Sequence, residues 1–187
     1  MNERLKEAID KANKIVFLTG AGISVPSGLP QYQGNRDAKE GYDAIRSVLE
    51  EKIKNAEPSA GHHFIAGLFN SGKDVHVITQ NVDSLHQKAG LPLERVYELH
   101  GNLERGDVVE FGMMLPEDPW EKAVLAACTS DLFIVIGTSL QVSPVNIIPE
   151  KVLDERIPVW IINKTETPLD WRIADCVIRE DLVDALS

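Results

Sequence analysis

Six short apolar segments constrain the fold of this chain more than any other feature of its sequence. Several of them are unbroken hydrophobic runs, such as Leu132–Ile136, and not an alternation of apolar and polar residues. Strands that are buried on both faces have this pattern, which is typical of a parallel sheet covered by helices on each side. The predicted strands are Ile15–Thr19, Val75–Thr79, Val96–Leu99, Leu132–Gly137, Val159–Asn163 and Cys176–Ile178.

Helical stretches fall between these strands, and the alternation predicts an α/β fold with a Rossmann-like, doubly wound parallel sheet. The N-terminal stretch is polar with apolar residues at helical spacing, which favours an amphipathic helix over a signal peptide. The connection from Gly34 to Gly72 is too long for one helix, so we expect a small helical lobe at about 35–72. The other predicted helices are Asp37–Lys54, His62–Asn70, Ser84–Ala89 and Trp120–Cys128.

Length and composition limit the class of protein. The chain has 187 residues, which suits a single domain over 1–187. A formal net charge of −10 argues against binding to nucleic acid, and it fits either lysine-rich partners or plain solubility. No apolar run approaches the ~20 residues that a membrane helix needs. The two cysteines, Cys128 and Cys176, form no C-x-x-C pair, so we expect reduced thiols, a cytoplasmic protein and no metal.

The loops that follow the predicted strands are polar or rich in glycine. They read "TGAGIS", "TQNVDSLHQKAG", "HGN", "GTSLQVSP" and "NKTE" in chain order. In a doubly wound sheet, ligands bind beyond the carboxyl ends of the strands. We therefore expect these five loops to meet at one rim and to form the functional site.

Two of these loops could hold phosphate groups. Gly20-Ala21-Gly22 and Gly137-Thr138-Ser139 each follow a strand, where backbone N–H groups can face a pyrophosphate. A tight turn that needs glycine would explain the first loop equally well, and Val25 stands where a dinucleotide motif has its third glycine. Two such loops on one rim favour a dinucleotide over two unrelated turns.

Three polar residues on the rim are candidates for chemistry. Asn81 and Asp83 follow the second strand, although Asp83 could simply cap the next helix. His100 follows the third strand, and it is the only one of five histidines expected at a strand end on this rim. A histidine there suits a general base near neutral pH.

The motifs "GAGISVPSGLP", "TQNVDSLHQKAG", "ELHGN", "VVEFGMMLP" and "GTSLQVSP" together resemble the sirtuins, the NAD-dependent protein deacylases. They occur in the family's order and span most of the chain. The resemblance implies a Rossmann-type domain that cleaves NAD at the nicotinamide–ribose bond. It also implies that an acyl group passes from the partner, an acylated lysine in a protein or peptide, to ADP-ribose.

The resemblance further implies a role for each matching residue. His100 would be the general base, and Asn81 would act with it in catalysis. Val108, Val109, Glu110, Phe111 and Gly112 would form a strand that pairs with the substrate peptide. NAD would be held by Gly20, Ala21, Gly22, Ser24, Tyr32, Gln80, Asp83, Gly137, Thr138, Ser139, Asn163, Cys176 and Val177.

The sequence departs from the family in two places. Sirtuins usually have D-F-R where this chain has Gln31-Tyr32-Gln33, so an aromatic ring is kept and an arginine is lost, with Arg36 as a possible substitute. Sirtuins also carry a module with four zinc-binding cysteines after the H-G motif. Here only Gly101 to Asp107 separate His100 from Val108, so a shortened substrate loop at about 101–116 replaces it.

These departures leave three hypotheses for the function. The first is a zinc-free, minimal NAD-dependent lysine deacylase. The second is an NAD glycohydrolase or ADP-ribosyltransferase, which a more open acceptor side would favour. The third is a non-catalytic sensor of NAD or ADP-ribose, which the lost arginine favours and the retained His100 disfavours. The acyl chain, the protein target and the oligomeric state are not specified by the sequence.

Overall fold

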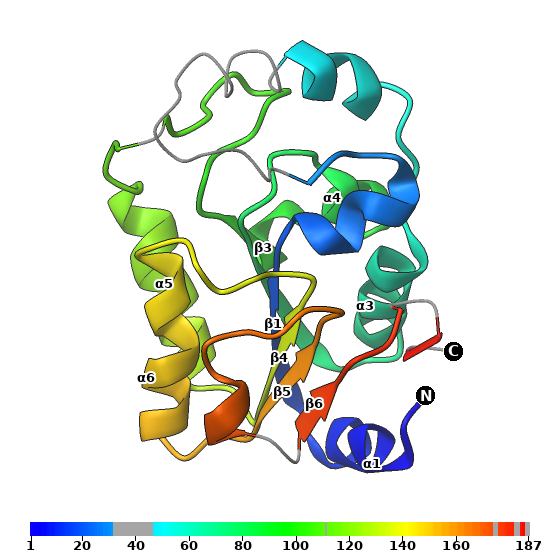
Figure 1. Ribbon diagram of the computed structural model, residues 1–187, viewed down its shortest axis with the longest axis vertical. Coiled ribbons are helices and arrows are strands. Elements are labelled where there is room, and N and C mark those ends of the chain that lie inside the picture. Colours follow the sequence, from blue (N-terminus) through cyan, green and yellow to red (C-terminus); the bar gives the residue numbers. More distant parts are fainter. Residues whose placement is uncertain (32–46, 111, 174–175, 182–183, 186–187) are drawn as a thin grey trace.

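Six parallel strands form a single sheet in the order β3-β2-β1-β4-β5-β6 (Figure 1). The computed structural model describes residues 1–31, 47–110, 112–173, 176–181 and 184–185. This strand order confirms the predicted Rossmann-like sheet, whose order reverses between β1 and β4. The strands are β1 Lys14–Thr19, β2 Asp74–Thr79, β3 Val96–Glu98, β4 Leu132–Ile136, β5 Val159–Ile162 and β6 Val177–Ile178.

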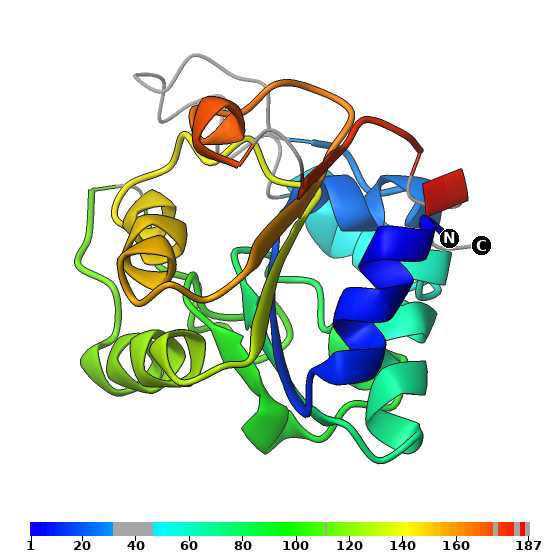
Figure 2. The ribbon, with the colours of Figure 1, turned by 90° about the horizontal axis from the view of Figure 1, so that it is seen from below.

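Helices cover both faces of the sheet (Figure 2). Helices α1 (Glu3–Lys11) and α3 (Ala60–Asn70) lie on one face, and α5 (Glu117–Cys128) and α6 (Ile148–Asp154) lie on the other. We did not predict α6 from the sequence. It carries Pro149 at its start, where a proline is compatible with a helix because the first N–H groups have no helical partner.

The two faces of the sheet bury separate apolar layers. Ile15 and Phe17 of β1 pack on the side of α1 and α3, and Val16 and Leu18 pack on the side of α5 and α6. Successive side chains of a strand point to opposite faces, so a strand buried on both faces must be apolar throughout. The unbroken hydrophobic runs therefore reflect strands that are buried on both faces, as the sequence indicated.

The loops after β1 and β4 touch each other backbone to backbone where the strand order reverses. The Gly22 N–H donates to the Gly137 carbonyl at 2.8 Å. A Cβ on Gly22 would lie 2.7 Å from the Gly137 Cα, and a Cβ on Gly137 would lie 2.5 Å from the Ile23 nitrogen. Gly137 also has φ +61°, in the left-handed region that favours glycine. Both positions need glycine so that the two loops can meet.

A small apolar cluster lies beyond the sheet, between a helix at 47–53, the short helix α4 (Leu85–Lys88) and neighbouring loops. Leu29, Ile53, Ala56 and Leu85 are its buried members. The helix at 47–53 confirms the described end of the predicted Asp37–Lys54 helix. Residues 37–46 lie outside the described residues. No helix in the described ranges is long and apolar enough to cross a membrane.

Gly137→Ala should lower the free energy of unfolding by about 2–4 kcal/mol, because the new methyl group collides with backbone and the backbone conformation disfavours a side chain. Gly67→Ala is the matched control, since a Cβ there has nothing within 4 Å in the middle of α3. The control should gain about 0.5–1 kcal/mol. Urea denaturation of both variants measures the difference, and an equal effect of the two substitutions would contradict the loop contact.

Candidate functional site

A buried hydrogen-bond network joins the loops after β1 and β2. The Asn81 side-chain amide donates to the Gly20 carbonyl at 3.2 Å and to the Ser24 hydroxyl at 3.0 Å. The Ser24 hydroxyl in turn donates to Asp83 Oδ2 at 2.6 Å. All three side chains are buried. The structure thus brings together Gly20, Ser24, Asn81 and Asp83, as the sequence predicted.

Asp83 has the capping role that the sequence offered as one alternative, and it also binds Ser24. Its Oδ1 accepts from the Leu85 N–H at 3.0 Å, which caps α4, while its Oδ2 holds Ser24. The N-cap position is Ser84, in a left-handed conformation, so the helix begins one residue later than predicted while the capping side chain is still Asp83. Burial raises the pKa of Asp83, against the opposing effect of the hydrogen bonds from Ser24 and Leu85. The carboxylate is thus held by its donors in a dry site.

Two buried threonines at the ends of β1 and β2 support this network, and the sequence analysis did not identify them. The Thr79 hydroxyl accepts from the Asn81 N–H at 3.1 Å and from the Thr19 hydroxyl at 2.9 Å. Thr19 Oγ1 also contacts His86 Nε2 at 2.9 Å. Burial lowers the pKa of His86 well below its usual value, so the ring is neutral. A buried threonine at the end of each of two apolar strands was the available signal.

His100 lies at the end of β3 and faces the loops after β2 and β4. Its Nδ1 donates to the Gln80 carbonyl at 3.1 Å, and the Gln80 side-chain amide donates to the Thr138 hydroxyl at 2.9 Å. Thr138 also accepts from the Leu140 N–H at 3.3 Å. His100, Gln80 and Thr138 therefore come together on one rim, as predicted.

The protonation of His100 follows from its surroundings. Because Nδ1 donates to a carbonyl, the neutral ring carries its proton there and its lone pair on Nε2. Burial lowers the pKa of His100, and the bond to Gln80 opposes that effect. Nε2 has no hydrogen-bond partner among the described residues, and the same holds for Asn81 Oδ1. These two polar atoms are available to a ligand at the rim.

The remaining predicted cofactor residues are spread more widely. Ser139 is exposed beside Thr138, and Asn163 follows β5 with its amide donating to Thr165. Cys176 and Val177 lie at the start of β6, where they pack against the two apolar layers of the sheet. Their assignment to the adenine stays a prediction. Tyr32, with Gln33 and Arg36, lies outside the described residues.

The predicted substrate segment does not form a strand in its described part. Residues 108–110 have no regular secondary structure, and Phe111 lies outside the described residues. The Val109 N–H donates to the His100 carbonyl at 2.9 Å, and Gly112 and Glu110 are exposed. The strand expected over 108–112 therefore stays a prediction. A strand needs a ladder partner, and for this segment that partner was expected to be the peptide.

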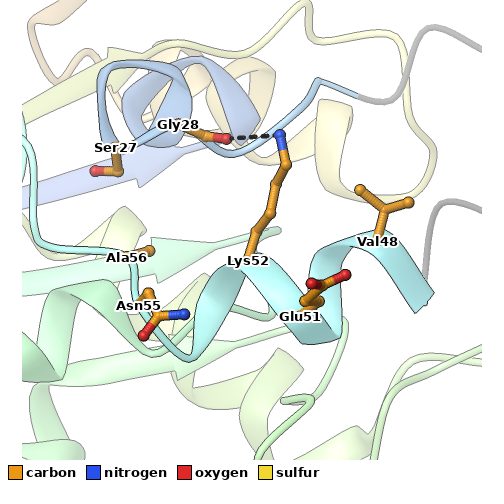
Figure 3. A pocket seen from close by; sticks show the side chains of 7 residues that line it. All are labelled: Ser27, Gly28, Val48, Glu51, Lys52, Asn55 and Ala56. Atoms are coloured by element: carbon orange, nitrogen blue, oxygen red, sulfur yellow. Dashed lines mark hydrogen bonds between the residues drawn. The ribbon is translucent and has the colours of Figure 1, made fainter.

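A pocket of about 340 Å³ lies beside the network, between the end of the 3-10 helix Ala21–Ser27 and the helix at 47–53 (Figure 3). The Lys52 ammonium spans it and donates to the Gly28 carbonyl at 3.3 Å. None of the rim side chains lines it, so the network defines the candidate site and the pocket does not. Its lining residues are Ser27, Gly28, Val48, Glu51, Lys52, Asn55 and Ala56.

Metal ligands do not gather in the part of the chain that the structure describes. No three His, Cys, Asp or Glu side chains among those residues come close enough to share an ion. Cys128 and Cys176 form no disulfide with each other, and both are partly buried. His62 is the other buried histidine near α4. Its ring lies edge-on to the His86 ring, with 4.7 Å between the two ring centroids. Burial lowers the pKa of His62 to about 4, so its ring is neutral as well.

Comparisons with known proteins agree with this geometry. The model of the Sir2 family matches residues 35–106. NAD-dependent protein deacetylase 1 of Bradyrhizobium diazoefficiens is 32% identical, with 98% of this chain and 93% of the relative covered. NAD-dependent protein deacetylase 2 of Caldanaerobacter subterraneus is 34% identical over 98% of this chain and 92% of the relative.

Solved structures are equally similar. A Sir2 complex with p53 peptide and NAD+ has a TM-score of 0.83 and 30% identity, with 100% of this chain and 96% of that chain covered. A mutant Sir2 homologue in complex with 2′-O-acetyl ADP-ribose has a TM-score of 0.87 and 29% identity, with 100% and 94% covered. The alignment to the Bradyrhizobium relative runs over 237 residues, so that relative carries residues that the 187 of this chain lack.

Proposed function

The chain belongs to the Sir2 family, and we propose that it is an NAD-dependent protein lysine deacylase. In this reaction an acyl group passes from a lysine side chain to ADP-ribose, and nicotinamide is released. The relatives that cover nearly the whole chain are named deacetylases, and similar Sir2 structures contain NAD+ or acetyl ADP-ribose. The observation that carries the proposal for this chain is the rim that joins His100, Gln80 and Thr138 beside Asn81, Ser24 and Asp83.

The residues of the rim fit NAD. The rim lies where the strand order reverses, which is where doubly wound sheets bind dinucleotides. Asn81 Oδ1 and His100 Nε2 remain free for ribose hydroxyls or a carboxamide, while the Asn81 amide nitrogen and His100 Nδ1 are already paired. NAD supplies the chemistry of the reaction, because its glycosidic bond to nicotinamide breaks and its ribose accepts the acyl group.

The protein residues orient the reactants and move one proton. His100 accepts that proton at Nε2 from a ribose hydroxyl, since Nδ1 is committed to the Gln80 carbonyl. Asn81 and Asp83 would hold the nicotinamide half of the cofactor, and both are hydrogen-bonded to Ser24. The phosphates and the central part of NAD would be held by Gly20, Ala21, Gly22, Thr138 and Ser139. The adenine side would be held by Asn163, Cys176 and Val177.

The substrate side rests on the segment from Val108 to Gly112. We propose that an acylated lysine of a protein or peptide approaches this segment from solvent and uses its backbone as a hydrogen-bonding edge. The acidic character of the whole chain, with net charge −10, supports a lysine-rich partner and disfavours nucleic acid. Two cysteines that form no disulfide support a reducing, cytoplasmic environment.

Incubation with NAD, with and without an acetylated lysine peptide, tests the proposed function. We expect nicotinamide release that depends on the peptide, together with deacetylated peptide and acetylated ADP-ribose. Release at the same rate without peptide would identify the glycohydrolase alternative. Binding of NAD by calorimetry with no release under either condition would identify a sensor, and either result would overturn the deacylase proposal.

His100→Ala should reduce the deacylation rate by ~10²–10⁴ while NAD still binds, because a positioned base is lost and the other contacts remain. In the unmodified protein the base works only when neutral, and burial lowers its pKa. The rate should therefore rise with pH through an apparent pKa below 6.5 and then level off. The exposed His63, in α3, provides the control His63→Ala. A His100→Ala variant with near-normal kcat would contradict the role of the base.

We also propose that the fold needs no zinc. Two cysteines that lie far apart in sequence cannot supply four thiolates, and Gly101–Asp107 is closed by its own hydrogen bonds. The purified protein should contain no stoichiometric zinc by elemental analysis, and a chelator should leave its melting temperature unchanged. Zinc at one ion per chain, with a chelator-dependent melting temperature, would overturn this.

A further inference from the structure

The shortened loop after β3 is organised around one buried carboxylate. Glu98 is the last residue of β3, and its side chain is only 5% exposed. Its Oε1 accepts from the Gln87 amide at 2.9 Å and from the Asn102 amide at 2.6 Å, and its Oε2 accepts from Arg105 Nη1 at 2.5 Å. A buried carboxylate is stable only when such donors surround it. Glu98 has three of them, from α4 and from the loop.

The loop itself is tied at nearly every position. Asn102 Oδ1 accepts from the N–H groups of Glu104 and Arg105, and Asp107 Oδ1 accepts from the Asn102 N–H at 2.7 Å. Arg105 Nε donates to Asp107 Oδ2 at 3.0 Å. Arg105 therefore joins the buried carboxylate of β3 to the far end of the loop. The loop is therefore a turn closed by its own hydrogen bonds.

The same turn fixes the backbone on both sides of His100. Upstream, the Gly101 N–H donates to the Glu98 carbonyl at 3.2 Å, and downstream the Val109 N–H donates to the His100 carbonyl at 2.9 Å. Gly101 has φ +73°, and a Cβ there would lie 2.1 Å from the Asp107 carbonyl oxygen. His100 thus lies between the end of β3 and the closed turn, and hydrogen bonds of that turn hold the backbone on both sides of it.

We propose that Glu98 and Arg105 are positioning residues for His100, and that their ion pair holds the proposed base where a zinc module is absent from the sequence. This inference rests on the deacylase function proposed above. Arg105 touches neither the rim nor NAD in the proposed arrangement, so it acts through the backbone of His100. Arginine suits this task because its guanidinium reaches Glu98 with one nitrogen and Asp107 with another.

The alternative is an ordinary stabilising ion pair. Arg105 is 43% exposed, and exposed ion pairs contribute little on their own. A purely stabilising pair would lower the melting temperature when removed and leave kcat per folded molecule unchanged. A positioning pair changes kcat and the environment of the His100 ring in protein that is still folded.

The chain offers a matched control at the other end of the same strand. Arg95 precedes β3 and forms an ion pair with Asp74 at the start of β2, and it is 32% exposed. Arg95→Ala removes the same type of side chain from the same strand, remote from His100. Arg105→Lys is the conservative variant, because its ammonium can still reach one carboxylate without bridging two.

The experiment measures kcat, the KM for NAD and the His100 imidazole resonance of ¹³C-histidine-labelled protein for each variant. Arg105→Ala should lower kcat on the order of 10- to 100-fold, as expected when a reacting group is misplaced, with little change in the KM for NAD. Its His100 resonance should shift, and the Val109 amide should exchange faster with solvent. Arg105→Lys should recover part of the rate, and Arg95→Ala should leave all three measurements near their normal values.

Several results would overturn the inference. An unchanged kcat and an unchanged His100 resonance in Arg105→Ala would do so, as would equal losses in Arg95→Ala. If Arg105→Ala fails to fold, Arg105→Lys decides, and a normal resonance with a normal rate in that variant overturns it. The resonance and the amide exchange need no activity, so they test the positioning even if the unmodified protein proves inactive and the deacylase proposal fails.

Discussion

The contact between Gly22 and Gly137 is the constraint on which the rest of the site depends. It brings the backbones after β1 and β4 together at the point where the strand order reverses, with the Gly22 N–H bonded to the Gly137 carbonyl. No side chain fits between them. The loops after β1 and β2 are neighbours through strand pairing, which puts the Gly20 carbonyl in reach of Asn81, and the loop after β4 brings the Thr138 hydroxyl in reach of Gln80. The glycines thus shape the rim because they let the two loops pack against each other, and this role does not depend on phosphate binding.

The polar side chains of the rim serve the fold and the proposed chemistry with the same atoms. A buried polar group must find partners, so Asn81, Ser24 and Asp83 satisfy one another and leave few atoms free. The atoms that stay open, Asn81 Oδ1 and His100 Nε2, are the ones that a ligand can use. A side chain whose other atoms are fixed in this way is already oriented when the ligand arrives, which is the condition for efficient catalysis.

Much of this structure could be predicted from the sequence, and the rest could not for physical reasons. The apolar runs indicated all six strands, and the polar residues after them indicated the rim, because both depend on local pattern. The support of Asn81 by Thr19 and Thr79 depends on which strands become neighbours, and the pairing of Glu98 with Arg105 depends on the conformation of the loop after β3. Composition does not encode that choice. The strand expected at 108–112 depends on a ladder partner in another molecule, so the fold of the chain alone does not determine it.

The two halves of the proposed reaction rest on parts of the chain with different internal bonding. The NAD half is held by side chains from the loops after β1, β2, β3 and β4, which are bonded to one another and largely buried. The acceptor half rests on a segment in which Glu110, Gly112, Met113 and Met114 are exposed, with Met114 at 91%. Its described backbone ties are few, chiefly Val109 to His100 and Met113 to Glu110. Substitutions in that segment can therefore change the choice of acceptor without disturbing the cofactor rim. The reverse does not hold, because His100 belongs to both halves: its imidazole faces the rim and its carbonyl anchors the acceptor segment.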